Sequence, residues 1–173
     1  MSDLFDGYKW PMANPDHKPF KHQVETSEFL LKNPKCFVLN DMGCVDSETE
    51  FLSPTGWVKI SVIKRVLVLG PLSTVHSVWA NEIKANFPHI KYAVAHGNKP
   101  ADRYDAVNSP AKIVIMNHDG IKSYNDLIMK GGFDLLIIDE LTAFKNVSTE
   151  RWKAARKVAA KCKGSWGMTA EPT

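Results

Sequence analysis

The sequence is poor in cysteine, in long apolar runs and in repeats, and each of these absences excludes a class of protein. The three cysteines, Cys36, Cys44 and Cys162, have no metal-ligand spacing and form no even-numbered set, which argues against a zinc site and a disulfide scaffold. No apolar stretch approaches the roughly 20 residues that cross a bilayer, so we expect no membrane partner. The amino terminus, MSDLFDGYKW, has no apolar signal core, and we therefore expect a cytoplasmic protein.

The remaining composition is that of one ordinary domain. The chain has 173 residues, of which 44% are hydrophobic and 24% are charged, and this is enough for a sizeable core. A net charge of +3 permits nucleic acid as a partner without requiring it. The six histidines show no metal-ligand spacing, and we assign none of them to catalysis. The evidence for function therefore comes from the order of local patterns along the chain.

Short apolar runs alternate with longer amphipathic stretches. The runs scarcely alternate with polar residues, which is typical of strands buried on both faces of a parallel sheet. The stretches between them have helical spacing, and Ser148 or Thr149 is the candidate cap of the last one. This order predicts a doubly wound α/β domain that binds ligands at the carboxyl ends of its strands. The expected strands are 36–39, 66–69, 92–95, 113–116, 135–138 and, weakly, 165–168, and the expected helices are 20–32, 75–87, 121–129 and 148–161.

Residues 45–60 (VDSETEFLSPTGWVKI) interrupt the alternation. A helix should follow the first strand and its loop, but this segment has an acidic patch and then a turn, Ser53-Pro54-Thr55-Gly56, between two extended pieces. We expect it to be a short inserted β segment. It is the one place where the local pattern and the predicted fold disagree.

The strongest chemical signal is the pair of adjacent carboxylates, Asp139 and Glu140, at the end of an apolar strand. An ATPase needs such a pair, because one carboxylate organises Mg²⁺ and the next activates the attacking water. Two solvated acids at a strand end would give the same local pattern. The pair therefore predicts a catalytic site only in combination with other signals.

Asn40, Asp41, Met42 and Gly43 follow the first strand, where a phosphate-binding loop belongs. A complete loop of this kind needs glycines, a lysine for the β- and γ-phosphates and a hydroxyl for Mg²⁺. Only the first half is present, and no Gly-Lys-Ser or Gly-Lys-Thr occurs anywhere in the chain. Taken alone, the four residues are also compatible with an ordinary turn.

Three further positions carry polar groups where a nucleotide or a nucleic acid could be contacted. Gln23 opens the first helix, and its amide could read the N6 and N7 atoms of adenine, although taken alone a polar first helical turn is the more common meaning of this pattern. Ser73 and Thr74 lie in the loop after the second strand, where hydroxyls and backbone N–H groups at a helix start suit phosphate. Thr169, after the last strand, could link a nucleotide site to a DNA site.

The helix expected at 148–161 is rich in lysine and arginine and could contact DNA. A solvated face is the more common meaning of such a charge pattern.

In order and spacing, these segments resemble the first lobe of Swi/Snf-like helicases of superfamily 2, especially the compact ones in phages. The resemblance covers residues 18–43 and 62–173. It implies a RecA-like three-layer sandwich with a mostly parallel sheet, and an activity that uses ATP and Mg²⁺ to move along double-stranded DNA in a bacterial or phage-infected cell. The segments that carry it are Gln23, residues 40–43, GPLSTVHSVWANE at 70–82, IVIMNHDGI at 113–121, LLIIDELTAFKN at 135–146 and WGMTAEPT at 166–173.

The resemblance also implies roles for individual residues. Asp139 would hold Mg²⁺ and Glu140 would be the general base. Gln23 would read adenine, residues 40–43 would contact the nucleotide, and Thr169 would couple the nucleotide and DNA sites. Pro71, Ser73 and Thr74 would lie near the DNA backbone.

The chain departs from the family pattern in three places. The family loop continues from Met-Gly with Thr-Gly-Lys-Thr and a helix, and this continuation is missing here. The last motif is usually Thr-Gly-Thr-Pro, whereas Glu171 stands at its third position. The second lobe, which supplies an arginine finger in the family, does not follow Thr173. We therefore expect this form of the protein to lack turnover, since a single lobe cannot close on ATP.

The segment that begins at Cys44 resembles the opening block of an intein of the Hedgehog/intein type. Such blocks start with Cys or Ser, followed by a short strand, a turn with glycine and another strand, and phosphate-binding loops are favoured insertion sites. On this resemblance residues 44–61 are an intein fragment and Cys44 is the nucleophile that attacks the Gly43 carbonyl. The internal His and the terminal His-Asn that splicing also needs do not appear before the helicase-like sequence resumes. An unrelated β insertion is the alternative.

Three hypotheses of function follow. The chain is the ATP-binding lobe of a DNA translocase that is inactive in this form, the precursor part of an intein-containing helicase, or a DNA-binding module without catalysis.

Overall fold

The computed structural model describes residues 20–39, 63–97 and 99–169. Within them, six strands form one sheet in the order β1-β6-β5-β2-β4-β3, and every neighbouring pair is parallel. The strands are β1 (Lys35–Leu39), β2 (Val66–Gly70), β3 (Tyr92–Ala95), β4 (Ile113–Asn117), β5 (Leu135–Ile138) and β6 (Gly164–Thr169). All six lie where the apolar runs predict them, so the parallel α/β sheet is confirmed.

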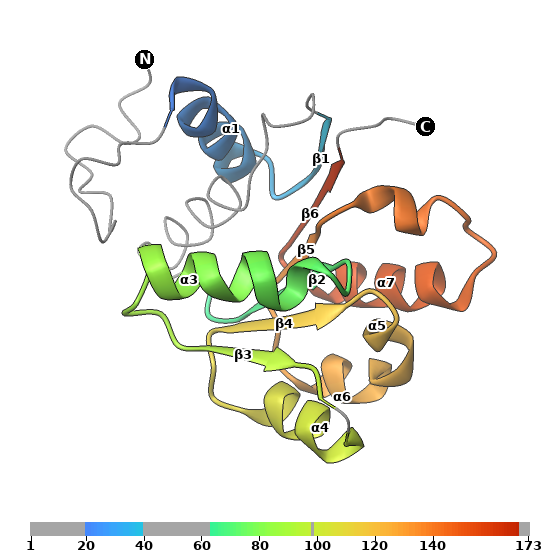
Figure 1. Cartoon of the computed structure of the whole chain (residues 1–173). Helices are drawn as coiled ribbons and strands as arrows, with labels where there is room; N and C mark the ends of the chain where they lie inside the picture. Colours follow the sequence, from blue (N-terminus) through green and yellow to red (C-terminus); the bar gives the residue numbers. More distant parts are fainter. Residues whose placement is uncertain (1–19, 40–62, 98, 170–173) are drawn as a thin grey trace.

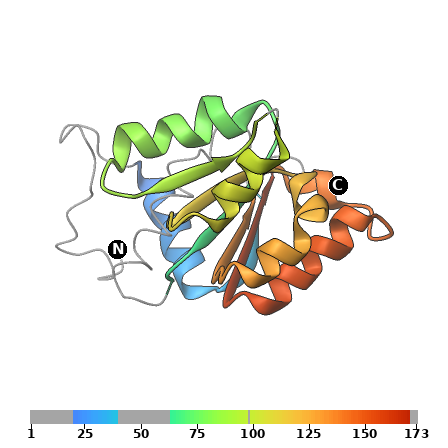
Figure 2. The same ribbon diagram turned by 90° about the horizontal axis from the view of Figure 1, so that it is seen from below.

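Helices cover both faces of this sheet (Figures 1 and 2). On one face lie α1 (Lys21–Lys32), the π-helix η2 (Val75–Ala80) and α3 (Asn81–Asn86), and their apolar side chains form one core with alternate residues of the strands. The other face carries α4 (Pro100–Asn108), α5 (Gly120–Ser123), α6 (Asn125–Lys130), the 3₁₀ helix η3 (Leu141–Phe144) and α7 (Glu150–Lys161), which form a second core. The result is the three-layer sandwich expected from the sequence.

Strand β2 lies at the centre and shows how the two cores are divided. Val66 and Val68 belong to the core under α1 and α3, whereas Leu67 and Leu69 belong to the core under α5 to α7. All four side chains are at most 1% exposed. A central parallel strand needs apolar residues at every position because both of its faces are covered.

The helix boundaries differ from the sequence prediction in ways that have local causes. The helix predicted at 121–129 is two short helices, α5 and α6, which are separated at Tyr124 (φ −117°, ψ 21°). Helix α4 was not predicted, because Val107 is its only buried residue and its apolar periodicity is weak. Of the two candidate caps of α7, Thr149 is the one used, and its hydroxyl accepts a hydrogen bond from the Trp152 N–H at 3.2 Å.

A half-buried arginine connects the segments at the amino ends of the strands. The Arg65 guanidinium lies 4.5 Å from the centre of the Phe133 ring. It donates to four backbone carbonyls, those of Val107, Ser109, Ala111 and Gly131, at 2.6 to 3.1 Å. Such a planar donor can fix several chain segments at once.

In the described part of the chain, no helix combines the length and apolarity that a membrane crossing requires. The inserted β segment expected at 44–61 lies outside the described residues.

Candidate functional site

Polar residues gather at the carboxyl ends of four neighbouring strands. Gly70 ends β2, His118 follows β4, Asp139 follows β5, and Thr169 ends β6. Backbone hydrogen bonds hold these ends in register: the Asp139 N–H donates to the Leu69 carbonyl at 2.8 Å, and the His118 N–H donates to the Gly70 carbonyl at 3.1 Å. The predicted acids therefore lie at the ligand edge of a rigid sheet.

Hydrogen bonds fix both the carboxylate and the backbone carbonyl of Asp139. Its Oδ2 accepts a hydrogen bond from the indole Nε1 of Trp79 at 3.0 Å, and its backbone carbonyl lies 2.7 Å from Nε2 of His118. Because a carbonyl can only accept, Nε2 of His118 must carry the proton. Burial raises the pKa of the Asp139 carboxyl, and the charge of Glu140 raises it further, while the Trp79 bond opposes both effects.

The side chains of Thr74, Trp79 and Asp139 lie close to the backbone of Gly70. A Cβ atom at that position would lie 3.3 Å from Oγ1 of Thr74 and 3.5 Å from both Oδ2 of Asp139 and Nε1 of Trp79. The loop after β2, the following helix and the Asp139 carboxylate therefore converge on one backbone position. A Cβ at position 70 would therefore be tight only against the Thr74 hydroxyl and in ordinary contact with the other two groups.

Glu140 differs from its neighbour in conformation and exposure. It is exposed, and it is the one non-glycine residue with positive φ in the described part of the chain (φ 57°, ψ 63°). That left-handed backbone is unfavourable for residues with a Cβ, and strain of this kind clusters at functional sites. Oε1 of Glu140 accepts hydrogen bonds from the hydroxyls of Thr142 at 2.8 Å and Thr169 at 3.3 Å.

Thr169 therefore contacts the predicted general base directly, from the adjacent strand β6. The structure brings together Asp139, Glu140 and Thr169, three of the residues singled out in the sequence. Thr142 was not predicted, and neither was the role of Trp79 as a partner of Asp139.

His118 was also missed, since none of the histidines was assigned to the site. Its side chain is buried, and its ring packs edge-on against Phe144 at 5.2 Å between ring centres. Burial lowers the pKa of His118, so the neutral ring is favoured. The only available sequence signal was its position directly after a buried strand that belongs to the same sheet.

The loop Pro71–Thr74 connects the end of β2, at Gly70, to the start of η2, at Val75. Ser73 is exposed and Leu72 is 58% exposed. The Thr74 hydroxyl donates to the Pro71 carbonyl at 3.1 Å, and the Ser77 hydroxyl donates to the Ser73 carbonyl at 2.6 Å. The loop thus exposes Ser73, while its next residue, Thr74, lies with Asp139 close to the backbone of Gly70.

Gln23 is fully buried in α1. Its Oε1 accepts a hydrogen bond from the backbone N–H of Phe20 at 2.6 Å, and this contact closes the first turn of the helix. The predicted reading of adenine by Gln23 stays a prediction. Residues 40–43 and Cys44, the other predicted nucleotide and nucleophile positions, lie outside the described residues.

Much of the basic charge on and after α7 is engaged within the protein. Arg151 donates to Oδ1 of Asp119 at 2.8 Å and lies over the Phe144 ring. Lys153 pairs with Glu150 at 2.8 Å, and Lys161 donates to the carbonyl of Met129. These contacts favour a solvated, self-paired helix face over a DNA-binding one.

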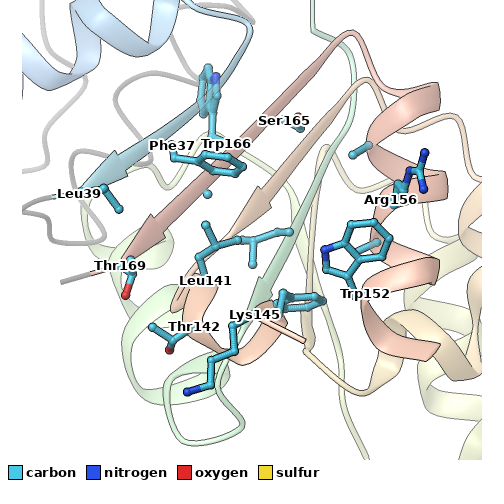
Figure 3. Close-up of a pocket in the computed structure, with 15 residues that line it drawn as sticks. Phe37, Leu39, Leu141, Thr142, Lys145, Trp152, Arg156, Ser165, Trp166 and Thr169 are labelled. Atoms are coloured by element: carbon cyan, nitrogen blue, oxygen red, sulfur yellow. The ribbon is translucent and has the colours of Figure 1, made fainter. Parts of the chain in front are cut away.

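A cavity of about 520 Å³ lies on the α7 side of the sheet, and its lining includes Ile138 and Leu141, the residues on either side of the carboxylate pair. Figure 3 shows Thr142 and Thr169 at the end of this cavity that lies near the tips of the strands, and Trp152 and Arg156 on its α7 side. The rest of its lining is mostly apolar and includes Phe37, which is 68% exposed. This part of the cavity is therefore suited to an apolar group.

Comparisons with known proteins agree with this architecture. The model of the SNF2-related domain family matches residues 10–173. The uncharacterized ATP-dependent helicase YqhH of Bacillus subtilis (strain 168) is 24% identical over 163 residues, which cover 91% of this chain and 27% of that protein. The structure of the Sulfolobus solfataricus SWI2/SNF2 ATPase core in complex with dsDNA superimposes with a TM-score of 0.79 at 18% identity, over 94% of this chain and 33% of that one.

The structural likeness confirms the RecA-like fold that the sequence predicted. The chain spans about a quarter to a third of the length of these relatives.

Proposed function

Since this chain belongs to the SNF2-related domain family, we propose that it supplies the nucleotide-binding lobe of a DNA-dependent ATPase that moves along double-stranded DNA. The observation that carries the proposal is the pair Asp139 and Glu140 at the end of β5, with the Thr169 hydroxyl on Glu140 from the neighbouring strand. Solvated acids at a strand end would not need a buried indole on one of them and a left-handed backbone at the other.

The residues present fit a magnesium ion held mainly by phosphate and water. Among the described residues, no group of three or more histidine, cysteine or acidic side chains could hold a metal alone. Mg²⁺ usually keeps several waters and takes one or two carboxylates together with substrate phosphates. Asp139 would be that carboxylate, since it stands directly after β5 at the carboxyl end of the sheet, next to the exposed Glu140. When bound, the ion would neutralise the developing charge on the transferred phosphoryl group.

Glu140 has the properties of a general base. It is exposed, so a water molecule can reach it, and two hydroxyl donors orient its Oε1. Its carboxylate would accept a proton from the water that attacks the γ-phosphate. Through its hydrogen bond, Thr169 would transmit a change in the protonation or position of this carboxylate to the end of β6. This is the coupling role that the resemblance implies.

Pro71, Ser73 and Thr74 would lie against the backbone of duplex DNA, with a second RecA-like lobe completing the motor. The solved relative is described as bound to dsDNA. Phosphate contacts from hydroxyls and backbone N–H groups fix position without reading sequence, which suits a translocase.

We further propose that this form of the chain lacks ATP turnover. No Gly-Lys-Ser or Gly-Lys-Thr is present, and that lysine with its loop amides stabilises the transferred phosphoryl group. The chain would keep the adenine contact at Gln23 and the Mg²⁺ contact at Asp139, but it would lack the lysine that binds the phosphates between them.

The test is the hydrolysis of Mg·ATP by residues 1–173, with and without duplex DNA, beside Glu140→Gln. We expect no DNA-stimulated phosphate release from either protein. Release that DNA stimulates and that Glu140→Gln abolishes would refute the inactivity and support the site. Release that Glu140→Gln leaves intact would refute the assignment of the base.

A second function is favoured by the intein-like string at residues 44–61. In that proposal, Sγ of Cys44 attacks the Gly43 carbonyl carbon, the Gly43–Cys44 peptide bond breaks, and a thioester and a free amine form. Added thiol would then release residues 1–43 as a new thioester.

Incubation with dithiothreitol followed by mass spectrometry tests this step. Fragments of 1–43 and 44–173 are expected from the unmodified chain but not from Cys44→Ala. Cys36→Ala is the matched control and should cleave normally. Absence of cleavage would leave residues 44–61 as an unrelated insertion, and sequencing the locus across codons 43 to 62 would distinguish a split gene from a joining artefact.

A further inference from the structure

Trp79 connects two parts of the site that are far apart in the sequence. Its indole N–H donates to Oδ2 of Asp139, sixty positions away, at 3.0 Å. The side chain is only 1% exposed and belongs to the core beneath η2. An indole N–H can only donate, so Oδ2 is the acceptor of this contact, and the same carboxylate also accepts a hydrogen bond from the backbone N–H of Glu140.

The helix that carries Trp79 is continuous with the loop proposed to contact DNA. The N–H groups of Thr74 and Val75 both donate to the Pro71 carbonyl, at 3.0 and 3.2 Å, so the loop and the first turn of η2 form one hydrogen-bonded unit. The helix is a π-helix over Val75–Ala80, a rare geometry that is frequent at functional sites.

The Asp139 backbone has separate supports. His118 donates to its carbonyl, and its own N–H donates to the Leu69 carbonyl of β2. Loss of the indole would therefore remove the tryptophan donor to the carboxylate, which would keep its bond from the Glu140 N–H, while the strand end stayed in place. The role of Trp79 can be separated in this way from the packing of the sheet.

We propose that Trp79 is a positioning residue that orients the Asp139 carboxylate and transmits the docking of duplex DNA on the Pro71–Thr74 loop to that carboxylate. The proposal rests on the function proposed above and gives its DNA-to-nucleotide coupling a physical route. A shift of the loop moves η2, η2 carries the indole, and the indole turns the carboxylate at the metal position. Thr74, Trp79 and Asp139 all lie close to the backbone of Gly70, so the loop, the helix and the carboxylate meet at one position.

The first measurement is the ¹⁵N–¹H spectrum of the tryptophan indoles in the full chain, assigned with Trp79→Phe. Asp139→Asn should shift the Trp79 indole resonance, because a charged acceptor is replaced by a neutral one. Trp166 provides an internal control, since its indole donates to the Asn33 carbonyl at 3.2 Å and should not move. An unchanged Trp79 resonance in Asp139→Asn would overturn the proposal.

The second measurement adds a short DNA duplex at low ionic strength, with binding followed in parallel by the fluorescence anisotropy of labelled DNA. We expect the Trp79 resonance to shift with the same midpoint as the anisotropy, and Ser73→Asp to weaken both by repelling phosphate. DNA binding without a Trp79 shift would overturn the transmission and leave the proposed function standing. Absence of any DNA binding would overturn both, and the anisotropy identifies that case.

Discussion

Replacement of Asp134 by asparagine should destabilise the fold strongly at neutral pH and less in acid. Asp134 lies at the amino ends of β2, β5 and β6, and its side chain is 16% exposed. Oδ2 accepts from the backbone N–H groups of Lys64 at 2.9 Å and Arg65 at 3.3 Å, and Oδ1 pairs with Nζ of Lys163 at 2.9 Å. Asparagine keeps the shape of the side chain and removes its charge.

The magnitude follows from these three contacts. Charge-assisted hydrogen bonds are about twice as strong as neutral ones, so each N–H bond should lose roughly 1 kcal/mol. The partly exposed ion pair adds about 0.5 kcal/mol. We therefore expect the free energy of unfolding to fall by about 2.5 kcal/mol, which corresponds to roughly 5–10 °C in Tm for a chain of this size.

The pH dependence provides the sharper test. Burial opposes ionisation of Asp134, but the hydrogen bond from Lys163 and the two N–H groups outweigh it and lower the pKa of the carboxyl. A carboxyl with a lowered folded-state pKa binds fewer protons when folded. Its stabilisation is therefore full above the unfolded value of about 3.9 and is lost as the pH falls through the folded value.

Urea unfolding, followed by far-ultraviolet circular dichroism from neutral pH down to about pH 3, measures this difference. The difference in unfolding free energy between the unmodified chain and Asp134→Asn should narrow steadily as the pH falls toward 3. Asp119→Asn is the control, because that carboxylate also pairs with cations, at 2.8 and 3.2 Å, but its side chain is 52% exposed. The control should lose under about 1 kcal/mol. A gap that stays constant with pH would refute the charge-based reasoning.

Three further predictions concern stability and reactivity. Arg65→Lys should lower the unfolding free energy by roughly 1–3 kcal/mol in urea titrations, because one ammonium group cannot reach four separate carbonyls, and an unchanged midpoint would contradict this. Gly164→Ala should cost a similar 1–3 kcal/mol by thermal unfolding, since its Cβ would lie 2.9 Å from the Pro34 carbonyl oxygen, and a stability gain would show that β1 moves aside freely. Burial raises the pKa of the Cys162 thiol to about 11, so iodoacetamide near pH 8 should label Cys162 far more slowly than the half-buried Cys36, as peptide mass spectrometry can measure, and equal rates would exclude this protection.

The sheet was predictable because its signal is local. Four or five consecutive apolar residues identify a doubly covered strand without knowledge of its neighbours. Even the weak run in β6 was placed correctly, although GSWGMT contains two glycines. Its position between β1 and β5 explains why so modest a strand forms, since it is paired along both edges.

The contacts within the site were not predictable, because each depends on several elements. The sequence pointed to Asp139 and Glu140, but the indole on Asp139 comes from a helix sixty residues earlier. The protonation of His118 at Nε2 depends on the backbone carbonyl of Asp139, which follows β5, while His118 follows β4. The left-handed backbone of Glu140 carries no residue-type signal, because glycine or asparagine would be the usual occupant.

The strand order has a consequence for how the chain folds as it is synthesised. Strand β1 pairs with β6, and Lys35 lies opposite Ser165. Strand β1 can therefore join the sheet through this pairing only after β6 has been synthesised. At about 5–20 residues per second, the intervening stretch takes roughly 7 to 26 s to emerge from a ribosome. Throughout that interval, Phe37 and Val38 lack β6, their partner in the described sheet, whereas β2, β3 and β4 can already assemble. The amino-terminal α1–β1 unit should therefore be the last to gain protection from hydrogen exchange, and the most dependent on chaperones until residue 169 is made.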